Sequence, residues 1–333
     1  MNTRSDPFLS IVVIGRNEGD RLSKCLESVK QMNFPQEKTE LIYVDSSSVD
    51  DSVQRAESLG AKVIQVDSSH HTAALARNHG WKAAGGEFVL FLDGDTLLDR
   101  DFVAASLPKF SHPDLGIIFG NTREMYPKKS VYNRVLDLDW SMRMGYTDIC
   151  GGNAIIRRTV LEQVNGYNSS LIAGEEPEMC NRMQKKGVLI LHLNTTMTLH
   201  DLNMTSFSEY WRRCFRTGYT YASISHLTRN RSKVLWRKNS LHNYLKGFLL
   251  LFLFAGSLSV VKFSYLPITL FFGILGLFIL RTAIKARSKS KDLLTCLLYG
   301  VHAHFQHIPM LFGQLTFWVD KWKNKARTLI EYK

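Results

Sequence analysis

The sequence predicts an α/β fold built on a doubly wound, mostly parallel sheet, and three observations support this prediction. Short apolar runs alternate with segments of helical period over the first hundred residues. Polar residues cluster directly after three of those apolar runs. The length of 333 residues suits two domains, or one large domain with an appendage. Such an alternation is typical of sheets whose ligands bind at the carboxyl ends of the strands.

The first strand and the first helix carry the strongest local patterns. Phe8–Ile14 is a β-branched run that ends at Gly15, which indicates a buried parallel strand. Asp20–Lys30 is predicted to be a helix because its apolar residues recur at helical spacing. Those residues are Leu22, Cys25, Leu26 and Val29. Further strands are expected at 41–44, 62–66 and 87–92, and further helices at 50–59 and 72–84.

Three polar clusters follow these strands, and we expect them to form one site. They are Arg16-Asn17-Glu18, Asp45-Ser46-Ser47-Ser48 and Asp93-Gly94-Asp95. Two carboxylates as close as those of Asp93 and Asp95 repel each other unless a cation lies between them. Oxygen ligands favour Mg²⁺ or Mn²⁺. Taken alone, Asp-Gly-Asp is also an ordinary turn.

The charge is divided unevenly along the chain. Residues 1–200 hold 22 Lys and Arg against 25 Asp and Glu, whereas residues 201–333 hold 20 against five. The whole excess of +12 therefore lies beside the long apolar runs of the C-terminal part. This pairing favours an anionic membrane surface as the partner and argues against a nucleic-acid-binding protein.

The C-terminal part is predicted to associate with a membrane. Residues 206–237 interleave aromatic residues with arginines, which is typical of helices at a lipid interface. Gly247–Val261 and Ser264–Leu280 are uncharged apolar runs of about the minimum spanning length, so a transmembrane hairpin is expected. The basic residues from Arg281 to Lys291 then face the cytosol by the positive-inside rule. The stretch 293–319 is interrupted by histidines and Pro309, so we expect it to lie on the membrane or dip into it.

The N-terminus and the cysteines indicate the compartment of the α/β part. The apolar run Leu9–Ile14 is too short for the core of a signal peptide. Five widely spaced cysteines without a CxxC pair make a disulfide framework or a zinc site improbable. We therefore expect the N-terminal α/β part to lie in the cytosol and the chain to be a multi-pass protein of the cell membrane.

Several motifs in order resemble the family 2 glycosyltransferases of the GT-A fold. They are Phe8–Glu18, Val44–Asp50, Ala76-Arg-Asn-His-Gly80, Gly86–Asp95, Gly151-Gly-Asn153, Gly174–Arg182 and Leu199-His200. The likeness covers about residues 8–220, and the combination is far more specific than any single motif. The apolar hairpin also resembles that of membrane-bound members that make surface polysaccharide or lipid-linked sugars. The resemblance implies a GT-A catalytic domain over 1–200, an interfacial segment over 201–245 and a membrane anchor over 246–333.

The resemblance assigns roles to individual residues. It implies that Asn17, Glu18 and Asp45 line the nucleotide pocket. Asp50 then caps the next helix or helps to position the nucleotide. Arg77 then faces the diphosphate, where its planar fork suits phosphate oxygens. Asp93 lies by the ribose and the metal, and Asp95 binds the metal through the Asp-x-Asp motif. His200 matches the position of a third metal ligand.

The resemblance also points to the catalytic base. The family pattern Gly-Glu-Asp appears here as Gly174-Glu175-Glu176, with Met179 and Arg182 in register. Glu176 therefore stands where the usual base is Asp, and Glu175 and Glu178 remain rivals. Glutamates at a helix N-terminus are also favoured by the helix dipole alone.

A later family signature, Gln-x-x-Arg-Trp, is absent, and the nearest match is Glu209-Tyr-Trp-Arg-Arg213. Arg213 is expected to grip a diphosphate, whereas the missing Gln argues against a processive polymer synthase. The segments 121–126 and 140–146 are expected to line the sugar pocket.

The function expected is therefore inverting transfer of one sugar from an NDP-sugar, by default a UDP-sugar, with a divalent metal. The expected acceptor is a saccharide on a polyprenyl diphosphate, in polysaccharide biosynthesis. One alternative is transfer onto a polyprenyl monophosphate. Another, from a different class, is a membrane-tethered sensor that binds nucleotide-sugars without turnover.

Overall fold

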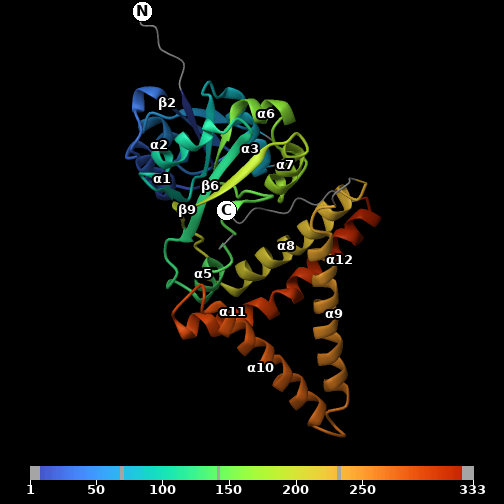
Figure 1. The fold of residues 1–333 in the computed structure, drawn as a ribbon. Coiled ribbons are helices and arrows are strands. Elements are labelled where there is room, and N and C mark those ends of the chain that lie inside the picture. Colours follow the sequence, from blue (N-terminus) through green and yellow to red (C-terminus); the bar gives the residue numbers. More distant parts are fainter. Residues whose placement is uncertain (1–7, 68–70, 141–142, 231–233, 325–333) are drawn as a thin grey trace, which may run out of the picture. The chain divides into compact units, whose positions relative to one another are not determined.

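The computed structural model describes residues 8–67, 71–140, 143–230 and 234–324 (Figure 1). It divides into two compact units. The first unit comprises Met1–Met125 and Trp140–Leu202 and holds the sheet. The second comprises Tyr126–Asp139 and Asn203–Leu329 and is helical. The predicted boundary at residue 200 lies close to the end of the first unit, but the grouping of Tyr126–Asp139 with the helices was not foreseen.

The first half of the sheet is parallel, as predicted. Its strands run in the order β3-β2-β1-β4. They are β1 (Leu9–Gly15), β2 (Thr39–Asp45), β3 (Lys62–Gln65) and β4 (Phe88–Asp93). The connecting helices are α1 (Asp20–Lys30), η1 (Gln36–Lys38), α2 (Ser52–Ser58) and α3 (Ala73–Ala83). All seven elements expected from the sequence are present, with ends that differ by a few residues.

The core explains why these segments adopt their structures. The four apolar residues predicted for the inner face of α1 are all buried. β1 is buried over nearly its whole length, as its β-branched run requires. α3 lies against β1 so closely that a Cβ on Gly80 would overlap the side chain of Val12. Gly80 therefore sets the distance between this helix and the sheet.

The second half of the sheet is mixed, which the less regular sequence of residues 101–200 did not reveal. β8 (Ala154–Arg157) is antiparallel to β4 and to β6 (Leu115–Glu124). β6 is parallel to β9 (Leu189–His200). β5 (Thr96–Leu98) and β7 (Gly145–Tyr146) pair antiparallel with β9. The helical elements of this half are α4 (Phe102–Ser106), η2 (Leu107–Ser111), α6 (Arg158–Val164) and α7 (Glu175–Gln184).

The second unit is made of helices from two separate stretches of the chain. They are α5 (Val131–Asp137), α8 (Phe207–Leu227), α9 (Arg237–Ser259), α10 (Leu266–Ala286), α11 (Leu293–Phe305) and α12 (His307–Trp322). α8 and α12 cross at two glycines, because a Cβ on Gly218 or Gly313 would overlap the backbone of the facing helix. Asn243 of α9 donates to Gln314 of α12 at 2.6 Å in the buried interface between these helices. α5 is held to α8 by stacking of Tyr132 on Tyr210, with ring centroids 5.2 Å apart.

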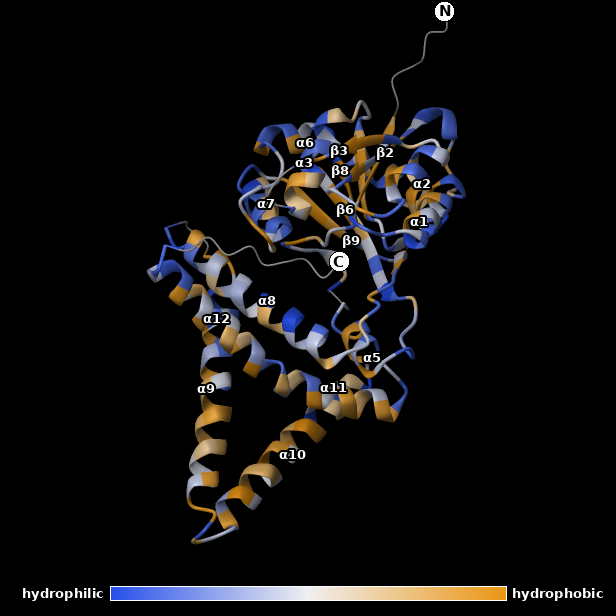
Figure 2. Ribbon diagram, turned by 180° about the vertical axis from the view of Figure 1, so that it is seen from behind, coloured by the Kyte–Doolittle hydropathy of each residue, from blue (hydrophilic) through white to orange (hydrophobic). Residues whose placement is uncertain are grey.

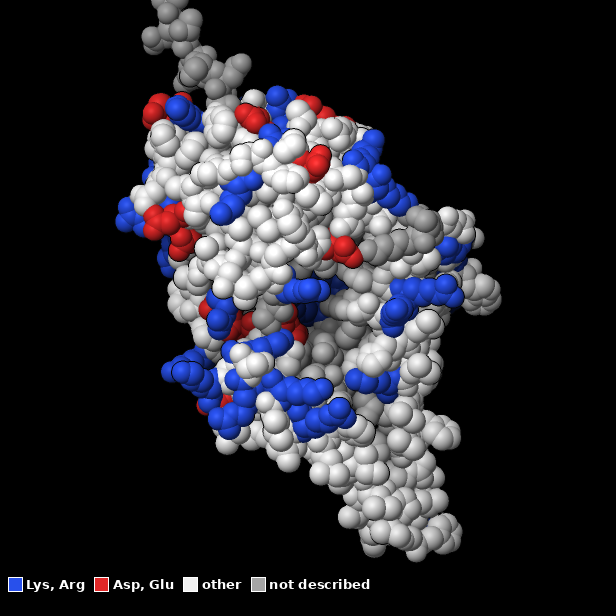
Figure 3. All heavy atoms as spheres, viewed as in Figure 1, with Lys and Arg blue, Asp and Glu red and all other residues white. Residues whose placement is uncertain are grey.

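α9 and α10 have the length and composition of membrane-crossing helices. Their large apolar side chains are mostly exposed, and Figure 2 shows them as a continuous apolar hairpin. On the face shown in Figure 3, Lys and Arg gather over the part of the helical unit above the hairpin, whereas the end of the hairpin shows no charged side chain. α9 begins at Arg237, so the candidate span starts inside the segment predicted to be interfacial.

The stretch 293–319 is not one continuous helix. It forms α11 and α12, which meet at Gln306, and neither is a candidate span among the described residues. Whether this part lies on the membrane stays a prediction.

Candidate active site

Strand register brings the three predicted polar clusters to one edge of the sheet. Gly15 pairs with Asp45, and Ile14 pairs with Asp93, so β1, β2 and β4 end side by side. The Asn17 side chain accepts from the backbone N of Val49 at 2.8 Å, which ties the first cluster to the second. The N of Gly94 donates to the backbone O of Ile14 at 2.8 Å and ties in the third.

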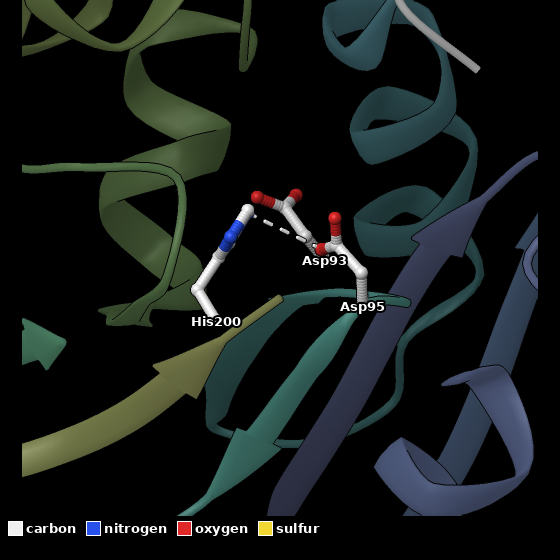
Figure 4. Close-up of side chains that lie close together, drawn as sticks. All are labelled: Asp93, Asp95 and His200. Carbon is white, nitrogen blue, oxygen red and sulfur yellow. Dashed lines mark ion pairs between the residues drawn. The ribbon is translucent and has the colours of Figure 1, made fainter. Parts of the chain in front are cut away.

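Asp93, Asp95 and His200 converge at this edge (Figure 4). One ligand atom from each lies within 4.8 Å of the others. His200 Nε2 is 3.4 Å from Asp95 Oδ1. The strands cause this meeting, because β5 pairs with β9 and sets Thr96 opposite His200. The Asp201 N also donates to the backbone O of Asp95 at 3.0 Å.

This donor set fits a divalent cation. Two carboxylates and an imidazole are ligands that Mg²⁺ or Mn²⁺ accepts. Asp95 is buried, whereas Asp93 and His200 are partly exposed and so remain open to a ligand from solution. An Asp-Asp-His cluster is thus present where the sequence predicts a metal, although the identity of the metal is not defined by these side chains.

Parts of the two segments expected to line the sugar pocket, 121–126 and 140–146, lie next to the cluster of Asp93, Asp95 and His200. Glu124 on β6 is paired with His200, and the Met125 N donates to the His200 O at 2.9 Å. The Trp140 ring lies edge-on to the His200 ring, with centroids 5.1 Å apart. Tyr126 belongs to the second unit.

Arg77 lies among three carboxylates. From α3, its Nη1 donates to Glu175 Oε1 at 2.9 Å and to Glu176 Oε1 at 3.0 Å. Its Nη2 donates to Asp93 Oδ1 at 3.0 Å. Burial opposes the charge of Arg77, but Glu176, Asp93 and Glu175 outweigh it and raise the pKa of the guanidinium above its usual value. The sequence did not predict these partners, and a contact of Arg77 with a diphosphate stays a prediction.

The acidic helix α7 presents its three glutamates differently. It begins after Gly174, which has a φ of 81° that suits glycine. The Glu178 side chain is 1% exposed and is paired at 2.9 Å with Arg182 of the same helix, which in turn donates to the Gly166 O at 2.7 Å. The Glu176 side chain is 16% exposed and that of Glu175 is 7% exposed. Glu176 is therefore the most accessible of the three, and its role as the base stays a prediction.

The residues predicted for the nucleotide pocket are largely engaged in shaping loops. Both carboxylate oxygens of Asp45 accept hydrogen bonds, from Tyr43 Oη at 2.9 Å and from the Ser48 N at 2.8 Å. Burial and the neighbouring Asp45 raise the pKa of Tyr43 well above its usual range. Glu18 is buried and paired with Arg21 at 2.9 Å. Their contacts with a nucleotide remain predictions.

Arg213 lies on α8 in the second unit, away from these residues in sequence and in domain. Its contact with a diphosphate stays a prediction.

The sequence analysis gave no role to two residues of the site, Asn153 and Gly152, or to the pair formed by Cys150 and Cys180. Asn153 Oδ1 accepts from the Asp93 N at 3.0 Å and fixes the end of β4. Gly152 lies so close to Arg77 that a Cβ there would overlap the guanidinium. Cys150 and Cys180 are buried with their sulfur atoms 3.5 Å apart. Their hydrogen bond and burial raise the pKa of Cys150. Only the short Gly-Gly-Asn motif gave any signal of this loop.

Comparisons with known proteins agree with this geometry. The model of the family described as glycosyl transferase family 2 matches residues 10–164. That of glycosyl transferase family group 2 matches residues 88–305. Two curated relatives are similar over most of the chain. Glycosyltransferase AglE of Haloferax volcanii is 23% identical, over 65% of this chain and 73% of its own length. The O-antigen chain rhamnosyltransferase RfbN of Salmonella typhimurium is 24% identical, over 64% and 72%.

Among solved structures, the mannosyltransferase PcManGT of Pyrobaculum calidifontis, in complex with GDP-Man and Mn²⁺, has a similar fold. Its TM-score is 0.59 at 16% identity, over 97% of this chain and 89% of that one.

Proposed function

The chain belongs to glycosyl transferase family 2 and has the GT-A fold, and on that premise we propose that it transfers a single sugar, with inversion, from a nucleoside-diphosphate sugar to a membrane-held acceptor. UDP-sugar is the default donor. A saccharide on a polyprenyl diphosphate is the acceptor, and polysaccharide biosynthesis is the setting. The observation that carries the proposal is the meeting of Asp93, Asp95 and His200 with the acidic helix α7 through Arg77.

The donor side of the reaction is assigned to the strand edge. Asn17, Glu18 and Asp45 line the nucleotide pocket, and Arg213 contributes positive charge toward the diphosphate. The resemblance also assigns Arg77 to the diphosphate, although its terminal nitrogens are bonded to Asp93, Glu175 and Glu176. Asp93, Asp95 and His200 hold the divalent cation. A cation bound there supplies charge neutralisation for the leaving diphosphate.

The acceptor side is assigned to α7. Glu176 takes the proton from the acceptor hydroxyl while the hydroxyl oxygen bonds to the anomeric carbon. The bond between that carbon and the diphosphate oxygen breaks, and the nucleoside diphosphate leaves with the electron pair. Glu175 is the second candidate for the base, since Arg77 Nη1 contacts both carboxylates.

The location proposed is the cell membrane, crossed by α9 and α10, with the catalytic domain in the cytosol. Support comes from the apolar, exposed faces of these two helices and from the basic residues that flank them. In this arrangement residues 1–200 are catalytic, 201–245 interfacial and 246–333 the anchor.

The alternative acceptor is a polyprenyl monophosphate. Its oxygen needs no deprotonation by a carboxylate, so Glu176→Gln would retain substantial activity. The sensor alternative predicts nucleotide binding without turnover.

A thermal-shift screen of the detergent-purified protein tests the donor site. UDP, GDP, CMP and dTDP are each added with and without Mn²⁺. Stabilisation by one nucleotide that needs the metal and is lost in Asp95→Ala supports the proposal. Absence of any metal-dependent shift, together with no sugar transfer or donor hydrolysis by folded protein, would overturn it.

A further inference from the structure

Arg77 connects the two halves of the site. Its Nη2 contacts Asp93, which belongs to the candidate cation site, and its Nη1 contacts Glu175 and Glu176 on α7. The Arg77 side chain is 3% exposed. A planar guanidinium can hold carboxylates on two of its nitrogen atoms at once, which a point charge cannot do. The separation between Asp93 and Glu176 therefore depends on a single buried side chain.

The surroundings fix the guanidinium in place. Gly152 leaves room for Nη2, since any side chain at that position would overlap it. The Tyr167 ring lies beside it, with its centroid 5.7 Å from Cζ. The loop that carries Tyr167 is itself anchored by Asn78, the residue after Arg77. Asn78 Nδ2 donates to the Tyr167 O at 2.8 Å, and the Tyr167 N donates back to Asn78 Oδ1 at 2.9 Å.

This arrangement lowers the stability of the fold, which suggests that it is retained for a function. A buried arginine with several carboxylates carries a desolvation penalty that well-packed apolar residues avoid. A guanidinium free to bind a ligand would be expected to point toward solvent. Both terminal nitrogens of Arg77 instead donate to protein carboxylates, Nη1 to two of them and Nη2 to one.

We propose that Arg77 is a positioning residue, which holds the carboxylate of Glu176 at a fixed distance from Asp93 and thus aligns the base with the donor held at the cation site. This inference rests on the proposed function, because it assigns Arg77 a part in that reaction. A positioning role and a diphosphate contact differ in the kinetic constant that a substitution of Arg77 changes. A positioning role lowers kcat at saturating donor and metal, and it acts through Glu176.

A double-mutant cycle on kcat tests the inference. The full chain is purified in detergent and assayed as wild type, Arg77→Lys, Glu176→Gln and the double variant, at saturating Mn²⁺ and donor sugar. Lysine keeps the buried positive charge, but its single nitrogen cannot hold both sides. We expect each single change to lower kcat by about 100-fold or more, because misplacing a base by about 1 Å has that effect. The double variant is expected to be within about threefold of Glu176→Gln alone, since a base that is absent cannot be misplaced.

A second variant covers the case in which Arg77→Lys does not fold. Gly152→Ala keeps the arginine and displaces its guanidinium, and its effect is likewise expected to vanish in the Glu176→Gln background. Arg157→Gln is the matched control. Arg157 is also a partly buried arginine in an ion pair, with Glu87 at 3.0 Å, but on β8 away from these carboxylates. It is expected to keep wild-type kcat.

The outcomes separate this inference from the proposed function. If the wild type transfers sugar and the factors for residues 77 and 176 multiply, Arg77 merely supports the fold and the inference is wrong, while the function stands. A wild type that transfers no sugar from any donor overturns the proposed function, and the role of Arg77 with it.

Discussion

His200 Nε2 lies 3.4 Å from Asp95 Oδ1, although more than 100 residues separate the two in the sequence. The contact is produced by the backbone, because β5 and β9 pair antiparallel and set Thr96 opposite His200. The register of β5 and β9 thus places His200, the third candidate metal ligand. As long as the two strands stay paired, movement of the loops does not change its position.

His200→Gln is expected to weaken the binding of Mn²⁺ with nucleotide by about tenfold or more, because one of the three side-chain ligands loses its imidazole nitrogen. The measurement is a titration of Mn²⁺ at fixed nucleotide, followed by thermal shift. His112→Gln, at an exposed position in the same unit, serves as the control. Equal metal affinity in His200→Gln and wild type would remove His200 from the site.

Glu176→Gln is expected to reduce turnover by about two to four orders of magnitude, because the amide cannot accept the proton of the acceptor hydroxyl. Nucleotide binding with metal should persist. The assay is transfer from a radiolabelled donor to lipid-linked saccharide. Glu175→Gln is run beside it, and a larger loss there would make Glu175 the base. Substantial activity in Glu176→Gln would instead favour a polyprenyl monophosphate acceptor.

Gly80→Ala is expected to destabilise the first unit by about 1–3 kcal/mol, because the added methyl group overlaps Val12 between α3 and β1. Thermal unfolding in detergent measures this change. Lys82→Ala, at an exposed position on the same helix, should stay within about 0.5 kcal/mol of wild type. An unchanged midpoint for Gly80→Ala would mean that α3 can move away from the sheet without loss.

The α9–α10 hairpin is expected to keep the protein in the membrane fraction during extraction with alkaline carbonate. Phe252 and Leu277 are exposed on α9 and α10, and Asp at each costs about 2.5–3.5 kcal/mol in a bilayer core. The double substitution to Asp should therefore shift the protein toward the soluble or aggregated fraction. Val49→Asp, at a fully exposed position in the first unit, should leave the distribution unchanged. Extraction of the wild type by carbonate would contradict a membrane-crossing anchor.

The sequence predicted the parallel half of the fold because each of its elements carries a strong local pattern. The buried strand β1 and the amphipathic helix α1 are examples in which local period and burial agree. β5 and β7 have three and two residues, too few for a period to be seen. Their positions are determined by pairing with β9, which is a long-range property.

The candidate site, like the fold, could be predicted only in part. The cluster of Asp93, Asp95 and His200 was expected from a motif order and is present. The partners of Arg77 were not expected, because a guanidinium can serve either a ligand or protein carboxylates and the local sequence is the same for both. The approach of Cys150 to Cys180 likewise depends on how α7 packs, and no spacing in the chain encodes it.

The chain passes between the two units after Met125, after Asp139 and after Leu202. A soluble catalytic fragment made by stopping at Leu202 would keep α5 but lose its helical partners α8 and α11. Val135, Leu136 and Leu138, each 4% exposed in the full chain, would then be left facing water and would invite aggregation. A workable truncation must also excise Tyr126–Asp139 and rejoin the ends with a short linker. By the same reasoning, the helical unit cannot be exchanged between relatives by a single crossover in the gene.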